Sequence, residues 1–195
     1  GDEMKTARMK VDLVDHMGTD LSVVNAARVS MAKESDWEWQ DCDHEKLSDK
    51  DVKLIQYLTK HNHWTPFGHC FATFRVKAPI FVARQLVKHQ IGLCWNEVSR
   101  RYVDEEPEFW FPDVWKERPE GSIKQGSGQA HYASMHIARL IERRTQESLN
   151  LYQSLIDDRV APEQARMVLP LNTMTEWIWS GSLAAWARVC KLRLD

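Results

Sequence analysis

The part of the chain best equipped for chemistry is residues 84–102, RQLVKHQIGLCWNEVSRRY. This short stretch gathers arginines, a lysine, a histidine, a carboxylate, amides and a serine hydroxyl, which is more polar chemistry than a structural segment needs. Guanidinium groups bind phosphate through paired hydrogen bonds, and a serine hydroxyl or a backbone N–H can complete the shell around such an anion. The segment therefore predicts a site for a phosphorylated ligand.

The elements expected to position these groups have two parts. The first has apolar residues at helical spacing and should form a helix that Pro79 opens and Gly92 ends. On that helix Arg84 and Lys88 would share a face, with Gln85 one turn before Lys88. The second part has no apolar stripe and should be a loop or an irregular strand that carries polar groups to one place.

Hydrophobic periodicity and turn residues predict the rest of the secondary structure. Strands are expected at 11–15 and 70–77, and helices at 20–30, 48–61, 129–157 and 183–192. A further helix should begin at Pro162 and be divided by Pro170, while 31–46 and 105–128 should be loops. Strands and helices in mixed order indicate an α+β fold.

Composition bounds the class of protein more loosely. The 195 residues are one domain's worth, and 43% hydrophobic with 28% charged residues allow a sizeable core. A net charge of -2 argues against a general nucleic-acid-binding or membrane-surface protein. The four cysteines form no C-x-x-C pair and no signal segment opens the chain, which favours the cytoplasm. No apolar run approaches the ~20 residues that a membrane helix needs.

The motifs of this chain resemble those of the flavin-dependent thymidylate synthases. That family's signature is Arg-His-Arg, a short spacer and Asn-Glu-x-Ser-x-Arg-Tyr. Here Lys88-His89-Gln90 stands in place of Arg-His-Arg, and the second part is matched by Asn96, Glu97, Ser99, Arg101 and Tyr102. Further matching blocks are AARVS at 26–30, KHNHWTPFGH at 60–69, VKAPIFVARQ at 76–85 and ARMVLPLN at 165–172. Separated blocks in the same order argue against coincidence, and the Lys-His-Gln form is similar to versions carried by bacteriophages.

The resemblance implies an activity and an assembly. The activity is the reductive methylation of dUMP to dTMP, with methylenetetrahydrofolate as the one-carbon donor and NADPH-reduced FAD as the hydride source. The architecture implied is a mixed β-sheet with helices, in a single catalytic domain over residues 1–195. A homotetramer with active sites between subunits is also implied. The family continues into a C-terminal helical tail, and we interpret this chain as lacking it.

The resemblance also assigns residues, position by position. The flavin-contacting positions are Ser30, His63, Thr65, Lys88, His89, Gln90, Glu97, Ser182 and Arg188. The dUMP-contacting positions are Gln85, Lys88, Glu97, Ser99, Arg101, Arg166 and Arg193. Arg193 would stabilise negative charge that develops on the uracil ring. The resemblance makes Ser99 the second catalytic candidate beside Arg193, because it stands where the family has a serine that has been proposed as a nucleophile.

Departures from the family pattern change the charge of the predicted site. Lys88 offers a point charge where an arginine would offer a fork of donors, and Gln90 removes a positive charge. We hypothesise that Arg100 and Arg188, which stand where the family has other residues, restore that charge.

Two other kinds of site chemistry are less favoured. His61, His63 and His69 suggest zinc, but no cysteine or carboxylate stands at ligand spacing beside them, so no metal is predicted. Cys94 lies near basic residues, a setting that activates thiolates. Because the family takes reducing equivalents from the flavin, we do not expect Cys94 to be catalytic.

Two other functions stay open. A related enzyme on the same scaffold would leave a hydroxymethyl group on the uracil nucleotide. Alternatively, residues 95–102 would form a basic, aromatic contact for single-stranded nucleic acid. The acidic residues at 104–106 follow at once and disfavour that second function.

Overall fold

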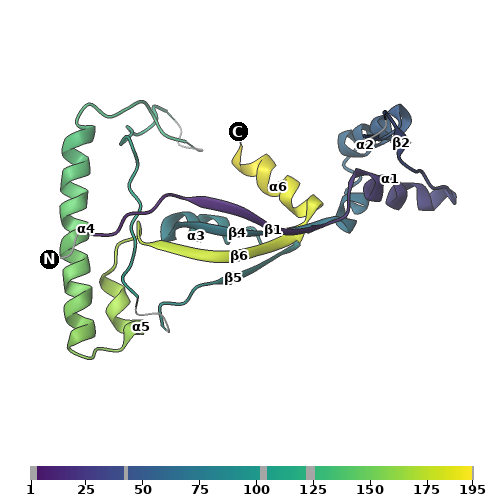
Figure 1. Cartoon of the computed structure of the whole chain (residues 1–195). Helices are drawn as coiled ribbons and strands as arrows, with labels where there is room; N and C mark the ends of the chain where they lie inside the picture. The colour runs from purple at the N-terminus through teal and green to yellow at the C-terminus, as the bar shows by residue number, and fades with distance from the viewer. Residues whose placement is uncertain (1–3, 42–43, 102–104, 122–125, 195) are drawn as a thin grey trace. The chain divides into compact units, whose positions relative to one another are not determined.

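The computed structural model describes residues 4–41, 44–101, 105–121 and 126–194. Tyr102 and Cys42 lie outside these ranges. The chain forms two compact units. The first unit comprises residues 1–10, 77–86 and 97–176, and the second comprises 11–76, 87–96 and 177–195. Helices and strands follow one another along the chain (Figure 1), so the expected α+β class is confirmed.

A four-stranded sheet has the strand order β1-β4-β6-β5. Its strands are β1 (Lys10–Met17), β4 (Phe71–Pro79), β5 (Leu93–Glu97) and β6 (Met174–Ser182). In the second unit the Leu183 N–H donates to the Cys70 carbonyl, and the hydroxyls of Thr73 and Ser180 lie 2.9 Å apart. Residue numbers therefore fall along β4 as they rise along β6, which makes the pair antiparallel.

Strand β6 is the main departure from the expected secondary structure. The helix predicted from Pro162 is short, because α5 (Pro162–Ala165) passes into the 3₁₀ turn η3 (Arg166–Val168) and ends there. Helix was therefore the wrong expectation after Pro170. Trp177 and Trp179 are buried while Ile178 between them is exposed, which is the two-residue period of a strand.

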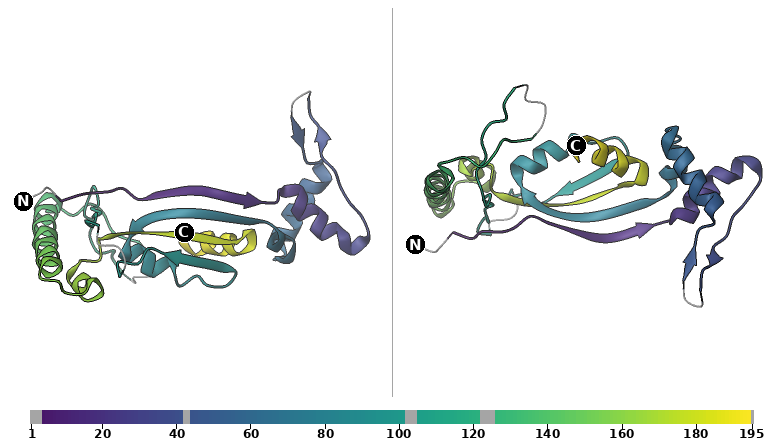
Figure 2. Two further views of the ribbon diagram at one scale, coloured as in Figure 1. Left: turned by 60° about the horizontal axis from the view of Figure 1, so that its bottom comes forward. Right: turned by 90° about the horizontal axis from the view of Figure 1, so that it is seen from above.

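The second unit holds the helical elements nearest the predicted flavin positions. They are α1 (Asp20–Arg28), η1 (Val29–Met31), α2 (Asp49–Lys60), η2 (Thr65–His69) and α6 (Leu183–Arg193). Residues 31–46 are not only loop, because β2 (Glu38–Trp39) and β3 (Glu45–Lys46) pair as an antiparallel hairpin. Figure 2 shows this hairpin extending away from α1 and α2. Val23, Leu58 and Cys70 form the core between these elements.

A layer of aromatic side chains in the second unit packs α6 against the sheet. Trp95 of β5 stacks on Trp177 with ring centroids 4.3 Å apart, and its ring meets that of Trp179 edge-on at 5.3 Å. Trp186 of α6 contacts both Trp179 and Phe74 edge-on. Its indole N–H also donates to the Ala72 carbonyl at 3.2 Å. Aromatic pairs of this geometry stabilise beyond the area that they bury, so α6 has a defined position.

The first unit is built around a long helix. It contains α3 (Ile80–Leu86), α4 (Ser134–Asp157), α5 and η3. Phe109, Leu149, Tyr152 and Ala165 form its core. Residues 105–121 contain no helix, as expected for that stretch. None of the helices in the described ranges is long and apolar enough to cross a membrane.

Helix α3 is shorter than predicted. Pro79 is the last residue of β4 rather than the first turn of the helix, and α3 ends at Leu86. Lys88 therefore lies outside the helix, and the expectation that it shares a helical face with Arg84 is wrong. The chain has to reverse before β5, and Gly92 takes a left-handed φ of 76° in that reversal.

Candidate active site

The second unit joins the predicted uracil-activating arginine to a predicted flavin contact. Arg193, at the end of α6, donates from Nε to Nε2 of His89 at 2.9 Å. The imidazole accepts this bond at Nε2, so its proton resides on Nδ1. Burial, and then the positive charge of Arg193, lower the pKa of His89. His89 is therefore neutral at pH 7 and orients the guanidinium of Arg193.

Helix α6 holds the same segment at a second point. Arg188 donates from Nη2 to the Ile91 carbonyl at 3.0 Å. At Gly92, an added Cβ would lie 3.2 Å from the Cβ of Ala185, so helix and turn are in close contact. The Lys88-His89-Gln90 segment is thus attached to α6 on its C-terminal side by Arg188, and through His89 by Arg193.

A cavity of about 510 Å³ opens beside α6 within the second unit. It is lined by Leu58, Thr59, Asn62, His63, Trp64, Phe67, Ala184, Ala187, Arg188 and Lys191. His63 and Arg188 belong to the predicted flavin set. Trp64 offers an exposed aromatic surface, Arg188 and Lys191 offer positive charge, and no acidic side chain is among these lining residues. Such a cavity suits a flat heterocycle that carries phosphate.

The other predicted flavin contacts of the second unit differ in how they are engaged. Ser30 is exposed and its hydroxyl donates to the Ala27 carbonyl at 2.9 Å. Ser182 caps α6, because its Oγ accepts from the Ala185 N–H at 3.2 Å. Three further predicted contacts, Thr65, Lys88 and Gln90, are exposed.

Three predicted contacts of the first unit, Glu97, Ser99 and Arg101, lie at the end of β5 and just after it. Glu97 accepts a hydrogen bond on Oε1 from the Thr175 hydroxyl at 2.8 Å. Ser99 Oγ accepts from the backbone N–H and from Nε of Arg101, both at 3.4 Å. Ser99 therefore helps to orient the Arg101 guanidinium, which is the group suited to an anion.

Two further predicted dUMP contacts are exposed on other elements of the first unit. Gln85 is exposed on α3. Arg166 is exposed in η3, and its Nε donates to the Glu163 carbonyl at 3.2 Å.

Arg100 has its own surroundings in the first unit. Its Nη1 donates to the Glu105 carbonyl at 2.9 Å, and it lines a second cavity with Glu105, Glu106 and Glu108. Lys5 forms an ion pair with Glu106 in the same cavity, at 2.7 Å. Arg100 therefore lies among acidic side chains of the first unit, and its suggested role in binding the flavin stays a hypothesis.

Two of the three clustered histidines, His61 and His63, pack against the ring of Tyr57. The ring centroid of Tyr57 lies 4.3 Å from that of His61 and 5.9 Å from that of His63. Among the described residues, no group of three or more His, Cys, Asp or Glu side chains is arranged to hold a metal ion. Cys94 is an exposed free thiol on β5.

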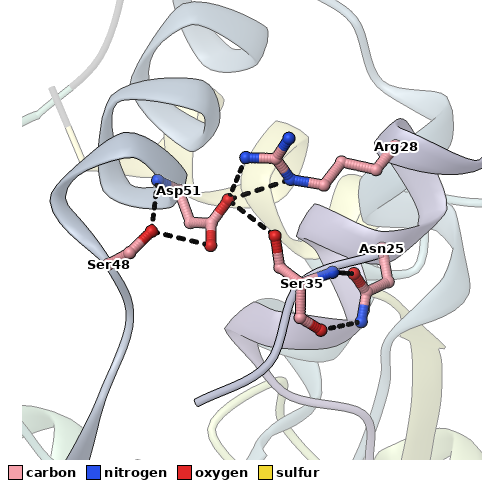
Figure 3. A network of polar contacts seen from close by, with 5 residues as sticks. All are labelled: Asn25, Arg28, Ser35, Ser48 and Asp51. Carbon is pink, nitrogen blue, oxygen red and sulfur yellow. Dashed lines mark hydrogen bonds and ion pairs between the residues drawn. The ribbon is translucent and has the colours of Figure 1, made fainter. Parts of the chain in front are cut away.

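The sequence did not reveal the role of Asp51. Its spacing from Ser48 is typical of a helix cap, and Ser48 Oγ accepts from the Asp51 N–H at 3.2 Å. The structure adds that Asp51 is only 2% exposed and is bound by Arg28, Ser35 and Ser48 (Figure 3). The sequence shows Arg28 in the AARVS block and Asp51 three residues after Ser48, but no local pattern indicates that Arg28 and Asp51 form a pair.

Comparison with known proteins gives consistent matches. The family described as thymidylate synthase complementing protein matches residues 12–195. The flavin-dependent thymidylate synthase of Thermosipho africanus is 40% identical over 184 residues, which are 94% of this chain and 76% of that protein. The corresponding protein of Pseudothermotoga lettingae is 38% identical over 185 residues, 95% of this chain and 76% of that protein. A crystal structure of the UMP/dUMP methylase PolB from Streptomyces cacaoi, bound with 5-Br UMP, aligns with a TM-score of 0.79 at 30% identity. That alignment covers 96% of this chain and 77% of the methylase.

Proposed function

We propose that this chain, which belongs to the thymidylate synthase complementing protein family, is a flavin-dependent thymidylate synthase that methylates dUMP to dTMP. The observation that carries the proposal is the cavity beside α6, where His63, Trp64, Arg188 and Lys191 line one space. The names of the relatives, flavin-dependent thymidylate synthases and a UMP/dUMP methylase, support the same reaction class.

The residues around the cavity fit a flavin nucleotide. Arg188 and Lys191 lie three residues apart on α6, so their positive charges project from one side of the helix, as a diphosphate requires. Trp64 and Phe67 provide the aromatic surface that a ring system needs. In the proposal FAD is held by Ser30, His63, Thr65, Lys88, His89, Gln90, Glu97, Ser182 and Arg188. The flavin, when bound, supplies the reducing equivalents that convert the transferred one-carbon unit into a methyl group.

The protein's own contribution centres on Arg193. In the proposal its guanidinium contacts the uracil ring and stabilises negative charge that develops there, which makes the base more electrophilic. The neutral His89 leaves Arg193 fully charged and fixes its orientation, because an imidazolium could not accept the Arg193 hydrogen bond. An arginine that is already oriented loses less freedom when the substrate binds.

Substrate binding completes the proposal. Gln85, Lys88, Glu97, Ser99, Arg101, Arg166 and Arg193 are the proposed dUMP contacts. Ser99 acts by holding Arg101 toward an anion, and the structure gives Ser99 no base that would activate it as a nucleophile among its described hydrogen bonds. The one-carbon donor is methylenetetrahydrofolate, and the reductant is NADPH.

The proposed setting is a cytoplasmic homotetramer with active sites between subunits. Its substrates are small molecules, with no nucleic acid and no membrane as partners. Support comes from the near-neutral net charge of -2, which gives no general attraction to polyanions.

The test is the visible absorption spectrum of the protein after FAD addition and desalting, followed by anaerobic NADPH and then dUMP with methylenetetrahydrofolate. We expect flavin that is retained, reduced by NADPH and reoxidised only when both substrates are present, with dTMP identified by mass. UMP in parallel reactions tests the wider substrate range named for the Streptomyces methylase. A product heavier than dTMP by one oxygen would instead identify a hydroxymethylase, and a protein that retains no flavin would contradict the proposal.

A further inference from the structure

Asp51 binds both ends of one surface loop. Its Oδ1 accepts from Arg28 Nε at 3.0 Å, from Arg28 Nη2, and from the Ser35 hydroxyl at 3.1 Å. Its Oδ2 accepts from the Ser48 hydroxyl at 2.9 Å. The residues between Arg28 and Ser35 therefore form a loop whose two ends meet at one carboxylate oxygen (Figure 3).

A second set of hydrogen bonds anchors the far end of this loop. The Ser35 N–H donates to Asn25 Oδ1 at 2.8 Å, and Asn25 Nδ2 donates to the Ser35 carbonyl at 3.0 Å. Inside the loop, Ala32 takes a left-handed φ of 53°, which a residue with a side chain adopts only when its surroundings enforce it. The loop begins with η1 and has a backbone bond of its own, from the Ala32 N–H to the Val29 carbonyl, and the contacts with Asn25 and Asp51 fasten its two ends.

The loop displays Ser30 between two uncovered apolar side chains. Val29 is 72% exposed and Met31 67% exposed. The loop itself follows α1, which packs on α2 and on the turn η2 that carries Thr65. Loop, α2 and η2 are therefore one helical block, and this block carries the predicted flavin contacts Ser30, His63 and Thr65.

We propose that Asp51 is a positioning residue of the flavin site, because by holding Arg28 and Ser35 it keeps loop 29–34 in the conformation that presents Ser30 and its apolar neighbours to the cofactor. This inference rests on the proposed function, since Ser30 is a proposed flavin contact. Asp51 itself is buried, and in this inference it acts through the loop.

The experiment compares Asp51→Asn with Asp49→Asn. Both substitutions remove one negative charge from the first turn of α2, but Asp49 is exposed, so the pair separates the loop anchor from the helix-end charge. We expect Asp51→Asn to raise the dissociation constant of FAD by about tenfold or more, and Asp49→Asn by less than about twofold, since a disordered loop must be reordered on binding. FAD binding is followed by quenching of flavin fluorescence at a temperature where circular dichroism shows both variants folded.

Limited trypsin digestion measures how often loop 29–34 opens, and it needs no cofactor. Lys33 lies in the loop and Lys53 lies on α2, and both are exposed. Asp51→Asn should speed cleavage after Lys33 by about tenfold while cleavage after Lys53 stays at the rate of Asp49→Asn, because local opening exposes only the loop. Added FAD should slow cleavage after Lys33 in the wild-type protein.

A milder variant keeps the test decisive if Asp51→Asn does not fold. Ser35→Ala removes one donor and leaves the Arg28 pair, so it should loosen the loop less, with about a threefold rise in the FAD dissociation constant. If the folded variants bind FAD as the wild type does, or are cleaved after Lys33 at its rate, the inference is overturned while the proposed function stands. If the wild-type protein retains no FAD, the proposed function itself is overturned, and the assignment of Asp51 to a flavin site falls with it.

Discussion

Replacement of Arg28 by alanine should cost far more stability than an ordinary surface ion pair. The substitution leaves the Asp51 carboxylate, 2% exposed, with hydrogen bonds from the two serine hydroxyls only. Removing one partner of a fully buried pair costs about 3–5 kcal/mol because the remaining charge is left unpaired. The Arg28 side chain is 22% exposed, so water screens part of the interaction and we take about 2–3 kcal/mol as the expected loss.

A double-mutant cycle assigns this loss to the pair itself. With a urea slope of about 2 kcal/mol per molar, the Arg28→Ala midpoint should fall by roughly 1 M. Once Asp51→Asn has removed the charge, Arg28→Ala should cost little more, giving a coupling free energy of about 2 kcal/mol. Urea unfolding followed by circular dichroism at 222 nm, a wavelength that reports helix content, measures all four proteins.

The matched control is Arg144→Ala. Arg144 donates to Glu147 at 2.7 Å on α4, but the two side chains are 65% and 51% exposed. An exposed pair of this kind contributes about 0.3–0.5 kcal/mol. If Arg28→Ala destabilises no more than Arg144→Ala, then the Asp51 network is not a stabilising anchor and the reasoning above is refuted.

Further predictions follow from the same structure. Burial alone would raise the pKa of Asp51, but hydrogen bonds from Arg28 and the serines outweigh burial and lower the pKa. The stabilisation by this network is therefore complete above about pH 4 and is lost as the pH falls through the folded-state pKa. The difference in melting temperature between the wild type and Asp51→Asn should accordingly shrink on acidification. Arg193→Ala should lower kcat by about 10²–10³-fold with FAD retained, and loss of flavin instead of turnover would show that it binds the cofactor. Gly92→Ala should destabilise by about 1–2 kcal/mol in urea, because φ is 76° and the new Cβ would meet Ala185 at 3.2 Å; an unchanged midpoint would contradict the close contact. Cys94→Ala should retain most activity, and total loss with FAD still bound would make Cys94 catalytic.

Elements whose pattern is local could be predicted from the sequence. Helix α2 could be predicted from its Ser48 cap and its apolar face, and α6 and β1 also lie close to where a helix and a strand were expected. The end of α3 could not be predicted in this way. The chain reverses after Leu86, with Gly92 in a left-handed conformation, and the start of α3 is held by backbone bonds from Ile80 and Phe81 to carbonyls of residues 171–173. Such contacts are distant in sequence and leave no period to detect.

In the candidate site too, the sequence identified residues but not the contacts that they make with one another. The motifs named His89 and Arg193 separately, but their hydrogen bond joins residues 104 positions apart. Asp51 shows the reverse case, because its local role as a cap was visible while its burial and its pairing with Arg28 were not. Sequence resemblance can thus identify the chemical groups, whereas their protonation and orientation depend on neighbours that only the fold supplies.

The position of Arg188 in the fold gives this side chain two roles. By sequence it suggested a replacement for the positive charge lost at Gln90. In the structure one of its N–H groups holds the Ile91 carbonyl, while the side chain lines the cavity beside Lys191. A guanidinium has five N–H donors, so one arginine can anchor the turn after Gln90 and still offer charge to a phosphate. Lysine at this position would have all its donors on one nitrogen, so it could not reach a carbonyl and a separate phosphate from different sides as a guanidinium can, and alanine would supply neither charge nor donor. Because the aromatic layer fixes α6, the anchor also fixes the segment that carries Lys88 and His89. The hypothesis that Arg188 compensates for Gln90 therefore includes this anchoring of the turn as well as the positive charge.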